Sequence, residues 1–264
     1  MRLRPTIHHG TPLTPRAALE AVCPGRAMCV SFYTPQDVET VDRISPKIMY
    51  DNGAFSEWRA ALKRGEPWFI REDWTPYYRW LEPRLFEPGR WAVIPDAPGA
   101  PSQLNDSLLK DWPFGTEKGA PLWHMDGPIS RLIDLASRYD RVCLGWVGEF
   151  DPATGTIRAD QKAVGCAAYR RTMDEVDKAF GNRWPENVHM MRGIAVAHDY
   201  PFGSADATSL AQNGHRYDSP MDALTGAPWR GRKAYADALE APGRKPWLGT
   251  LESVETDDRQ LTLI

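Results

Sequence analysis

The chain has 264 residues, of which 42% are hydrophobic, and this is enough for one large core of the size of a single α/β barrel. The formal net charge of −3 excludes a protein that binds nucleic acid through a strongly cationic overall field. No apolar run reaches the ~18 residues of a membrane span, and no apolar stretch follows residues 1–5 as in a signal peptide. We therefore expect an intracellular protein without membrane contact.

Eight short apolar or β-branched runs are expected to form strands. In chain order they lie near 6–9, 27–32, 47–51, 91–96, 121–125, 141–146, 188–194 and 202–206. Segments with helical spacing lie between them, at 14–22, 36–44, 73–82, 101–110, 128–138 and 160–180. Strand followed by helix, repeated along the chain, implies parallel strands joined by crossovers. Eight such strands predict an α/β fold of the (β/α)8, TIM-barrel type.

Insertions and a tail depart from the ideal barrel. Residues 56–90 and 111–120 are longer or richer in turn residues than simple crossovers, and 147–160 and 207–230 follow presumed strand ends, where they would surround the active face. We predict a single barrel domain over 1–245. The segment 246–264 has little core signal and is expected to be partly disordered.

Two aspartates stand at the carboxyl ends of predicted strands. Asp51 closes the run 47–51, and Asp206 closes the run 202–206. In an α/β barrel such ends converge on one face, so both carboxylates would face one substrate, as glycosyl transfer requires. The alternative for Asp51 is a simple turn, because Asp-Asn-Gly at 51–53 is a turn signature.

Further polar or small residues occupy the same strand ends. They are His9, Ser31, Asp96, His124, Gly145 to Glu149, and Arg192. Each has a structural alternative: Asp96 as the cap of a turn, His124 as a satisfied and partly buried histidine, and Glu149 as a residue that leads the chain out of its strand. Adjacent strand residues point to opposite faces, so His8 and His9 are poorly placed to bind one metal ion.

Cysteines and basic residues give weaker signals. Cys23, Cys29, Cys143 and Cys166 are widely spaced without a Cys-x-x-Cys pair, which favours buried free thiols over a disulfide or a zinc site. Residues 228–245 carry five basic and two acidic side chains. Arg230, Arg232 and Lys233 in this segment are candidates for nucleic-acid contacts, with a solvated helix face as the alternative.

Several of these segments resemble tRNA-guanine transglycosylases. Residues 49–56, Met-Tyr-Asp-Asn-Gly-Ala-Phe-Ser, resemble the Asp-Ser-Gly-Gly-Phe-Gln signature of that family, and 203–208, Gly-Ser-Ala-Asp-Ala-Thr, resemble the segment with its nucleophilic aspartate. Between them, Pro95-Asp96 resembles the guanine-recognising position. His124 falls where the family often has a glutamine, and 144–149 resemble its glycine-rich base-binding loop. The overlap spans roughly residues 45–215, and the motifs follow the order of the family.

One departure points to a particular branch. The tRNA enzymes hold zinc through three cysteines and a histidine near the C-terminus, whereas this chain has no cysteine after Cys166. The sequence is therefore more similar to the phage and bacterial DNA transglycosylases of the DpdA type. That resemblance implies exchange of guanine in DNA, rather than tRNA, for a 7-deazaguanine base such as preQ0. It also implies no metal or other cofactor, and a cytoplasmic setting in a bacterial cell, with the gene on the bacterial or a phage genome.

The resemblance assigns roles to the candidate residues. Asp206 would be the nucleophile and Asp51 the general acid and base of a double displacement. Asp96, His124, Gly145, Gly148 and Glu149 would hold the guanine-like base, with Phe55 or Trp146 stacking on it. Three alternatives remain at this stage: an N-glycosidase that lets water resolve the intermediate, a tRNA-guanine transglycosylase, and a base-binding protein without catalysis.

Overall fold

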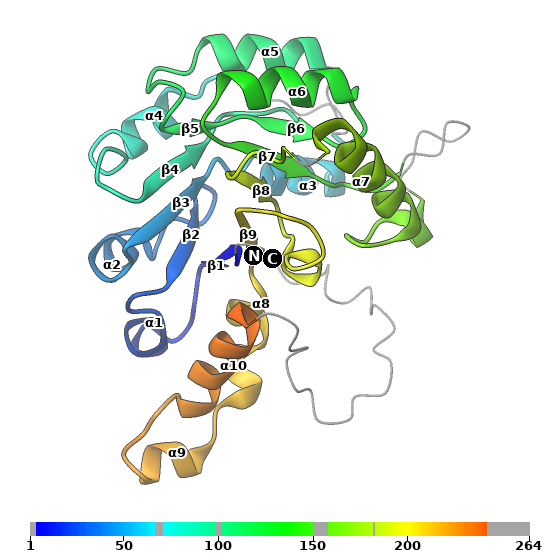
Figure 1. Ribbon diagram of the computed structural model, residues 1–264. Helices are drawn as coiled ribbons and strands as arrows, with labels where there is room; N and C mark the ends of the chain where they lie inside the picture. Colours follow the sequence, from blue (N-terminus) through cyan, green and yellow to red (C-terminus); the bar gives the residue numbers. More distant parts are fainter. Residues whose placement is uncertain (1–3, 67–70, 99–101, 150–157, 182, 242–264) are drawn as a thin grey trace.

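A computed structural model describes residues 4–66, 71–98, 102–149, 158–181 and 183–241, and these form an α/β protein around a single sheet (Figure 1). The strands are β1 (Thr6–Gly10), β2 (Ala27–Ser31), β3 (Lys47–Asp51), β4 (Arg90–Val93), β5 (Gly119–Ala120), β6 (Leu122–His124), β7 (Val142–Gly145), β8 (Val188–Met190) and β9 (Ser204–Ala207). Every pairing is parallel, and the order is β5-β4-β3-β2-β1-β9-β8-β7-β6. The prediction of a parallel, barrel-like α/β fold is confirmed.

The strand count differs from the expected eight because of one proline. The two edge strands of the order, β5 and β6, are separated only by Pro121. Proline has no N–H to donate to the strand ladder, so regular pairing stops there. On one side of the break, Ile94 N donates to Ala120 O (2.9 Å), and on the other, Cys143 N donates to Pro121 O (2.9 Å). The sheet is thus a nearly closed ring of nine strands in the described chain rather than a regular eight-stranded barrel.

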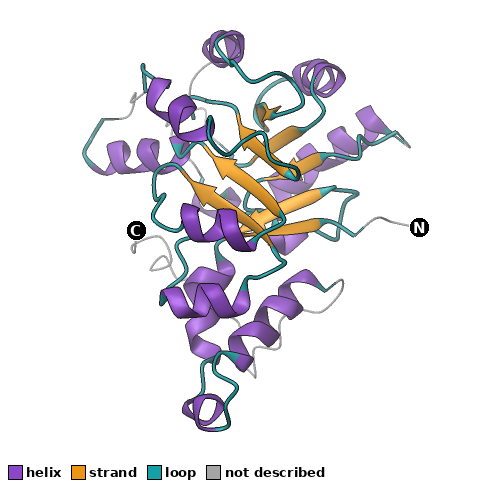
Figure 2. Cartoon of the chain, turned by 90° about the vertical axis from the view of Figure 1, so that its left-hand side faces the viewer, coloured by secondary structure: helices purple, strands orange, loops and turns teal. Residues whose placement is uncertain are grey.

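Helices lie around this sheet, most of them on its outer side (Figures 1 and 2), whereas α3 lies beside β8 in Figure 1, where its Phe55 meets Arg192. They are α1 (Arg16–Val22), α2 (Val38–Ile44), α3 (Ala54–Lys63), α4 (Thr75–Leu81), α5 (Ser102–Lys110), α6 (Ile129–Arg138), α7 (Ala167–Phe180), α8 (Ser209–Asn213), α9 (Pro220–Leu224) and α10 (Arg230–Glu240). The 3₁₀ turns η1 (Ala159–Gln161), η2 (Ile194–Val196) and η3 (Gly214–Tyr217) lie between them. All six predicted helical segments contain a helix, and the presumed insertions 56–90 and 207–230 contain most of α3, all of α4, and α8 and α9.

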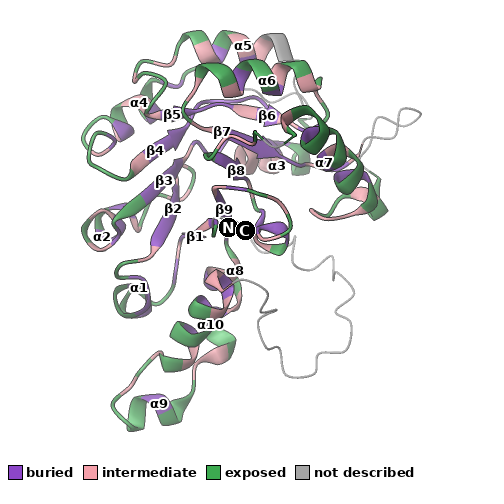
Figure 3. Cartoon of the chain, in the orientation of Figure 1, coloured by how far each residue is buried: buried purple, intermediate pink, exposed green. Residues whose placement is uncertain are grey.

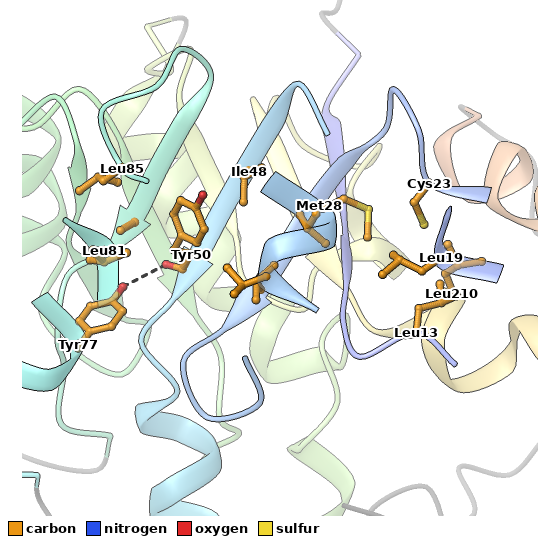
Figure 4. Close-up of a cluster of buried hydrophobic side chains, with 14 of the residues drawn as sticks. Leu13, Leu19, Cys23, Met28, Ile48, Tyr50, Tyr77, Leu81, Leu85 and Leu210 are labelled. Carbon is orange, nitrogen blue, oxygen red and sulfur yellow. Dashed lines mark hydrogen bonds between the residues drawn. The ribbon is translucent and has the colours of Figure 1, made fainter. Parts of the chain in front are cut away.

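Alternation along the strands separates an inner from an outer core. Outward residues such as Met28, Ile48 and Tyr50 join the helices in the large outer clusters, part of which Figure 4 shows. The inward residues between them, including Cys29 and Met49, form a small cluster inside the ring together with Trp91, Val93, Ala120 and Cys143. The strands are therefore buried on both faces, as parallel strands usually are (Figure 3).

The remaining sequence expectations concern cysteines, membrane contact and the tail. Cys23, Cys29 and Cys143 are buried free thiols, and Cys166 is half-buried. None of the helices in the described ranges is long and apolar enough to cross a membrane. The predicted tail, 246–264, lies outside the described residues, as does the end of the predicted domain beyond residue 241.

Candidate active site

Asp51 and Asp206 lie on the inner face of the ring, as the strand-end argument predicts. On β3, Asp51 follows the inward Met49 by two residues, and on β9 the outward Ala205 leaves Asp206 pointing inward. The two strands are separated by β2 and β1 in the sheet order. By strand count Asp206 is on the ninth strand of the described chain instead of the expected eighth, because Pro121 splits one strand into two.

The environment of Asp51 favours its protonated form. Burial raises the pKa of Asp51 to about 6; a hydrogen bond from Ser31 acts in the opposite direction, and the negative charges of Asp206 and Asp96 raise the pKa further. Ser31 Oγ donates to Asp51 Oδ2 at 2.8 Å, and Gly53 N donates to the same oxygen at 3.1 Å. The three aspartates thus share one electrostatic environment at the carboxyl ends of the strands.

Asp206 is held by a backbone amide and a buried histidine. Arg192 N donates to Asp206 Oδ1 at 2.7 Å, and Nε2 of the fully buried His189 lies 3.1 Å from the same oxygen. The other ring nitrogen of His189, Nδ1, lies 2.8 Å from Ser204 Oγ. Burial lowers the pKa of His189, while the hydrogen bond to Asp206 acts the other way. A neutral ring that accepts from Ser204 carries its proton on Nε2, where it donates to the carboxylate.

Each of these carboxyl groups keeps one oxygen free of hydrogen bonds to the described residues. The bonds to Asp51 all reach Oδ2, and those to Asp206 all reach Oδ1. One oxygen of each group is therefore held in place, and the other keeps its hydrogen-bonding positions free. This geometry is expected of catalytic carboxyl groups, which are oriented by the fold but keep part of their hydrogen-bonding capacity.

Asp96 and His124 meet at the same end of the sheet. His124 Nε2 lies 3.0 Å from Asp96 Oδ2, and Asn52 Nδ2 donates to Asp96 Oδ1 at 2.8 Å. Asn52 is buried and also donates to Ile94 O (2.9 Å) and accepts from Ala54 N (2.8 Å), so it fixes the start of α3 against Asp96. Asp51-Asn52 is thus more than a turn: its two side chains anchor two parts of the candidate site.

The predicted base-binding loop is divided between two places. Gly145 ends β7 on the inner face, where an added Cβ would meet the Leu122 side chain at 3.2 Å. Gly148 and Glu149 instead line a hollow of about 500 Å³ beside α6 and α7, which none of the three aspartates lines. Glu149 Oε1 accepts from Arg171 Nη2 at 3.0 Å. These two residues therefore do not share the surroundings of Asp51 and Asp206.

Of the two aromatic residues considered for stacking, only Phe55 lies beside the acids. It stands in the first turn of α3, and the Arg192 guanidinium carbon lies 4.1 Å from the centre of its ring. Trp146 is buried and packs against Tyr169 of α7, with ring centres 5.7 Å apart. Trp146 belongs to the outer core and lines the same hollow as Gly148 and Glu149, so its side chain is not placed beside Asp51 and Asp206.

The three basic candidates of α10 differ in exposure. Arg232 is buried: its Nε donates to Asp218 Oδ1 (3.0 Å) and its Nη1 to Thr14 O (2.7 Å). Its guanidinium is engaged within the fold, so it is unsuited to contact a phosphate. Arg230 is exposed and lies 3.2 Å from Asp222, and Lys233 is exposed. Only Arg230 and Lys233 present charge to solvent.

The two adjacent histidines of β1 point in opposite directions, as predicted. His8 lies inside the ring, 5.8 Å from the Trp91 ring centre, whereas His9 Nε2 lies 2.8 Å from Glu240 Oε1 of α10. No group of three or more histidine, cysteine, aspartate or glutamate side chains suited to a metal ion occurs within the described ranges.

Two residues of the site carry no clear sequence signal. His189 lies in the apolar run 188–191 and looks like part of a core strand, and Arg59, whose guanidinium carbon lies 5.9 Å from the centre of the Phe55 ring, lies in the middle of a helix. Both residues reach the site only through the fold, because β8 pairs with β9 and α3 follows β3. Comparison of the chain with known protein families, curated proteins and solved structures finds no match.

Proposed function

We propose that the protein is a transglycosylase that exchanges guanine in DNA for a 7-deazaguanine base. The observation that carries the proposal is the pair of inward carboxyl groups, Asp51 and Asp206, each anchored through one oxygen and open at the other. Their environments differ, since one is poised near neutrality and the other is bonded by two N–H donors. Such a division between two carboxyl groups is typical of an acid and a nucleophile in glycosyl transfer.

Asp206 is suited to be the nucleophile. Hydrogen bonds from Arg192 N and His189 stabilise its anion and orient it, while Oδ2 can approach the anomeric carbon of a nucleotide. As the bond from this oxygen to C1′ forms, the bond from C1′ to guanine N9 breaks, and its electron pair leaves with the base. The sugar is then esterified to Asp206, and the phosphate backbone stays intact.

Asp51 is suited to move the proton. With a pKa of about 6, a useful fraction is protonated near neutral pH and can donate to the departing guanine. The resulting carboxylate then takes the N9 proton of the incoming 7-deazaguanine, whose nitrogen attacks C1′ and releases Asp206. Protons and charges balance over the two steps, and configuration at C1′ is retained.

Asp96 supplies acceptors for a guanine-like edge. Each carboxylate oxygen has two lone-pair positions, and Asn52 and His124 occupy one position on each. The remaining positions can accept from the ring N–H and the exocyclic amine of guanine. His124 and the backbone at Gly145 lie on the same inner face, where they can contact the rest of the base, with Phe55 as the candidate for stacking on it.

The preference for DNA rests on the motif resemblance. Exposed Arg230 and Lys233 in the first turns of α10 are proposed backbone contacts. This end of α10 lies towards the carboxyl ends of the strands, because Arg232 reaches Thr14 just beyond β1. At the other end of the helix, Glu240 pairs with Arg26, which precedes β2.

The test is an exchange assay with labelled guanine. Duplex DNA and tRNA are incubated separately with the protein and candidate 7-deazaguanines, digested to nucleosides and analysed by mass spectrometry. We expect a 7-deaza-2′-deoxyguanosine to replace 2′-deoxyguanosine in DNA with release of labelled guanine. An abasic product without added base would reassign the protein as an N-glycosidase, and exchange in tRNA alone would reassign its substrate. If labelled guanine were released from neither DNA nor tRNA, the protein would be reassigned as a base-binding protein without catalysis.

A further inference from the structure

Two arginines converge on one aromatic ring beside the candidate nucleophile. The guanidinium carbon of Arg192 lies 4.1 Å from the centre of the Phe55 ring, and that of Arg59 lies 5.9 Å from it. Phe55 and Arg59 are four residues apart on α3 and so share a face of that helix. Arg192 follows β8, and its main-chain N–H is bonded to Asp206. Two cations from distant parts of the chain thus meet next to the site.

Neither guanidinium group forms an ion pair with a carboxylate in the part of the protein that the structure describes. Other arginines, such as Arg26, Arg71 and Arg232, lie within ion-pair distance of carboxylates. No such pair with a described residue is formed by Arg59 or Arg192, although Arg192 Nη2 donates to Trp146 O at 2.5 Å. Two guanidinium groups near one ring repel each other, Asp206 and Asp51 offset part of this repulsion for Arg192 without pairing with it, and a bound phosphate would relieve the rest.

The backbone of Arg192 is also held in an unusual conformation. Its φ of 52° lies in the left-handed region, which residues other than glycine rarely adopt. The bond from its N–H to Asp206 and the bond from its side chain to Trp146 O keep the residue there. Loss of solvation lowers the pKa of Arg192; Asp206 and Asp51 oppose that effect, and the nearby charge of Arg59 adds to it. The strained backbone therefore places a cation within the electrostatic reach of both candidate catalytic acids.

We propose that Arg59 and Arg192 form a phosphate clamp that binds the phosphodiester next to the nucleotide attacked by Asp206. This inference rests on the proposed function in taking a polynucleotide as substrate, and it excludes a free nucleoside, which has no phosphate to occupy the clamp. Guanidinium groups match the oxygens of a phosphate through paired N–H donors. The phosphates on either side of the target sugar are joined to it through its own 3′ and 5′ oxygens, so an anion site this close to Asp206 suits them.

The clamp predicts a coupling that binding alone can measure. The probe is a short fluorescent single-stranded DNA containing one guanine, compared with the same strand in which a methylphosphonate removes the charge of one phosphate flanking that guanine. The variants are Arg59→Gln and Arg192→Asn, since asparagine tolerates positive φ. A methylphosphonate at one of the two flanking positions should lower the affinity of the wild-type protein several-fold. The same methylphosphonate should leave the affinity of the double variant unchanged. The double variant should also lower the slope of log affinity against log salt by about 0.7, because one phosphate of a single strand is no longer neutralised.

Two controls separate a phosphate contact from a structural role. Exposed Arg79→Gln on the outer helix α4 removes the same charge away from the site and should leave the methylphosphonate effect intact. Arg192→Lys keeps the charge and should retain most of the salt dependence. An equal methylphosphonate effect in wild type and double variant, an Arg192→Lys protein that behaves like Arg192→Asn, or no binding of the strand would overturn the clamp.

The outcome is independent of the exchange reaction. A protein that shows the coupling without exchanging guanine would keep the clamp and lose the proposed transglycosylase activity. A protein that exchanges guanine without the coupling would keep the activity and lose the clamp.

Discussion

His189 Nε2 lies 3.1 Å from Asp206 Oδ1, and the opposite ring nitrogen lies 2.8 Å from Ser204 Oγ. The three residues form a buried chain of hydrogen bonds that ends on the proposed nucleophile. Ser204 and Asp206 lie two residues apart on the inner face of β9, and His189 reaches both from β8. The His189 side chain makes no other hydrogen bond to the described residues, and its ring packs edge-on against Trp91, with ring centres 5.1 Å apart.

His189→Leu should therefore slow formation of the sugar–enzyme intermediate by at least about 10-fold, since a hydrogen bond to a charged group contributes about 1.5–3 kcal/mol. His189→Gln should recover part of the rate, because its amide can donate from a position near Nε2. Single-turnover trapping with a guanine-containing strand measures the rate. A wild-type rate in His189→Leu, with lower thermal stability only, would show that the histidine merely supports the fold.

Asp51 should make stability depend on pH. Its pKa is about 6 in the folded protein against an ordinary value of 3.8, so the unfolded chain ionises first as pH rises. The folded state is therefore penalised progressively between these values, by up to about 3 kcal/mol above the folded pKa. Asp51→Asn should raise the free energy of unfolding by about 1–3 kcal/mol at pH 8 and change it little near pH 4. Urea unfolding across this range measures the difference.

Asp174→Asn on the exposed side of α7 is the matched control, because it makes the same substitution away from the candidate site. If Asp51→Asn lowered the free energy of unfolding relative to wild type as much at pH 8 as at pH 4, or more, the argument that burial raises the pKa of Asp51 would be contradicted.

Gly53 positions Asp51 and should not tolerate a side chain. Its φ is 79°, and an added Cβ would lie 2.9 Å from both Cβ and N of Tyr33. Gly25 has the same φ, but an added Cβ there meets nothing within 4 Å. Gly25→Ala should cost about 1–2 kcal/mol from the left-handed backbone alone. Gly53→Ala should cost more and also lower activity, and equal losses in urea unfolding would show that the Tyr33 contact is unimportant.

Much of the fold can be read from the alternation of the strands, and the exceptions have local causes. The pattern around Met49 and Asp51 predicts which face Asp51 occupies. It does not predict the break at Pro121, because β5 pairs on only two residues before the proline. Nor does it predict α10, whose buried face includes the charged Arg232 beside Tyr235 and Ala236. The sequence predicts a solvated position for Arg232, because it does not show that the fold places Asp218 beside it.

Some residues of the candidate site could likewise be predicted from the sequence, and others could not. Asp51, Asp96 and Asp206 stand at strand ends, where a sequence pattern can find them. His189 and Arg59 depend on which strand neighbours which and on the angle at which α3 leaves β3, and no spacing within the chain encodes either relationship.

The basic residues of α10 should separate into one structural and two surface positions. Arg232→Ala should destabilise the protein by about 3–5 kcal/mol, because it leaves Asp218 without its buried partner. Lys233→Gln should leave stability within about 0.5 kcal/mol, whereas Arg230→Gln removes the ion-pair partner of the buried Asp222 and should lower stability more. The two changes together should lower the salt slope of duplex binding by about 2, if each residue contacts one phosphate. Thermal unfolding and a salt titration test the two halves, and an unchanged slope would assign Arg230 and Lys233 to plain solvation.

The assignment of nucleophile and acid is tested most directly by trapping the intermediate. Protein is mixed with a guanine-containing strand without an incoming base, quenched in denaturant, and digested for peptide mass spectrometry. We expect a sugar adduct on Asp206 in wild-type protein, formed about 10²–10⁴-fold more slowly in Asp51→Asn, and no adduct or exchange in Asp206→Asn, whose amide cannot form the ester. An adduct on Asp51, or exchange by Asp206→Asn at the wild-type rate, would contradict the assignment.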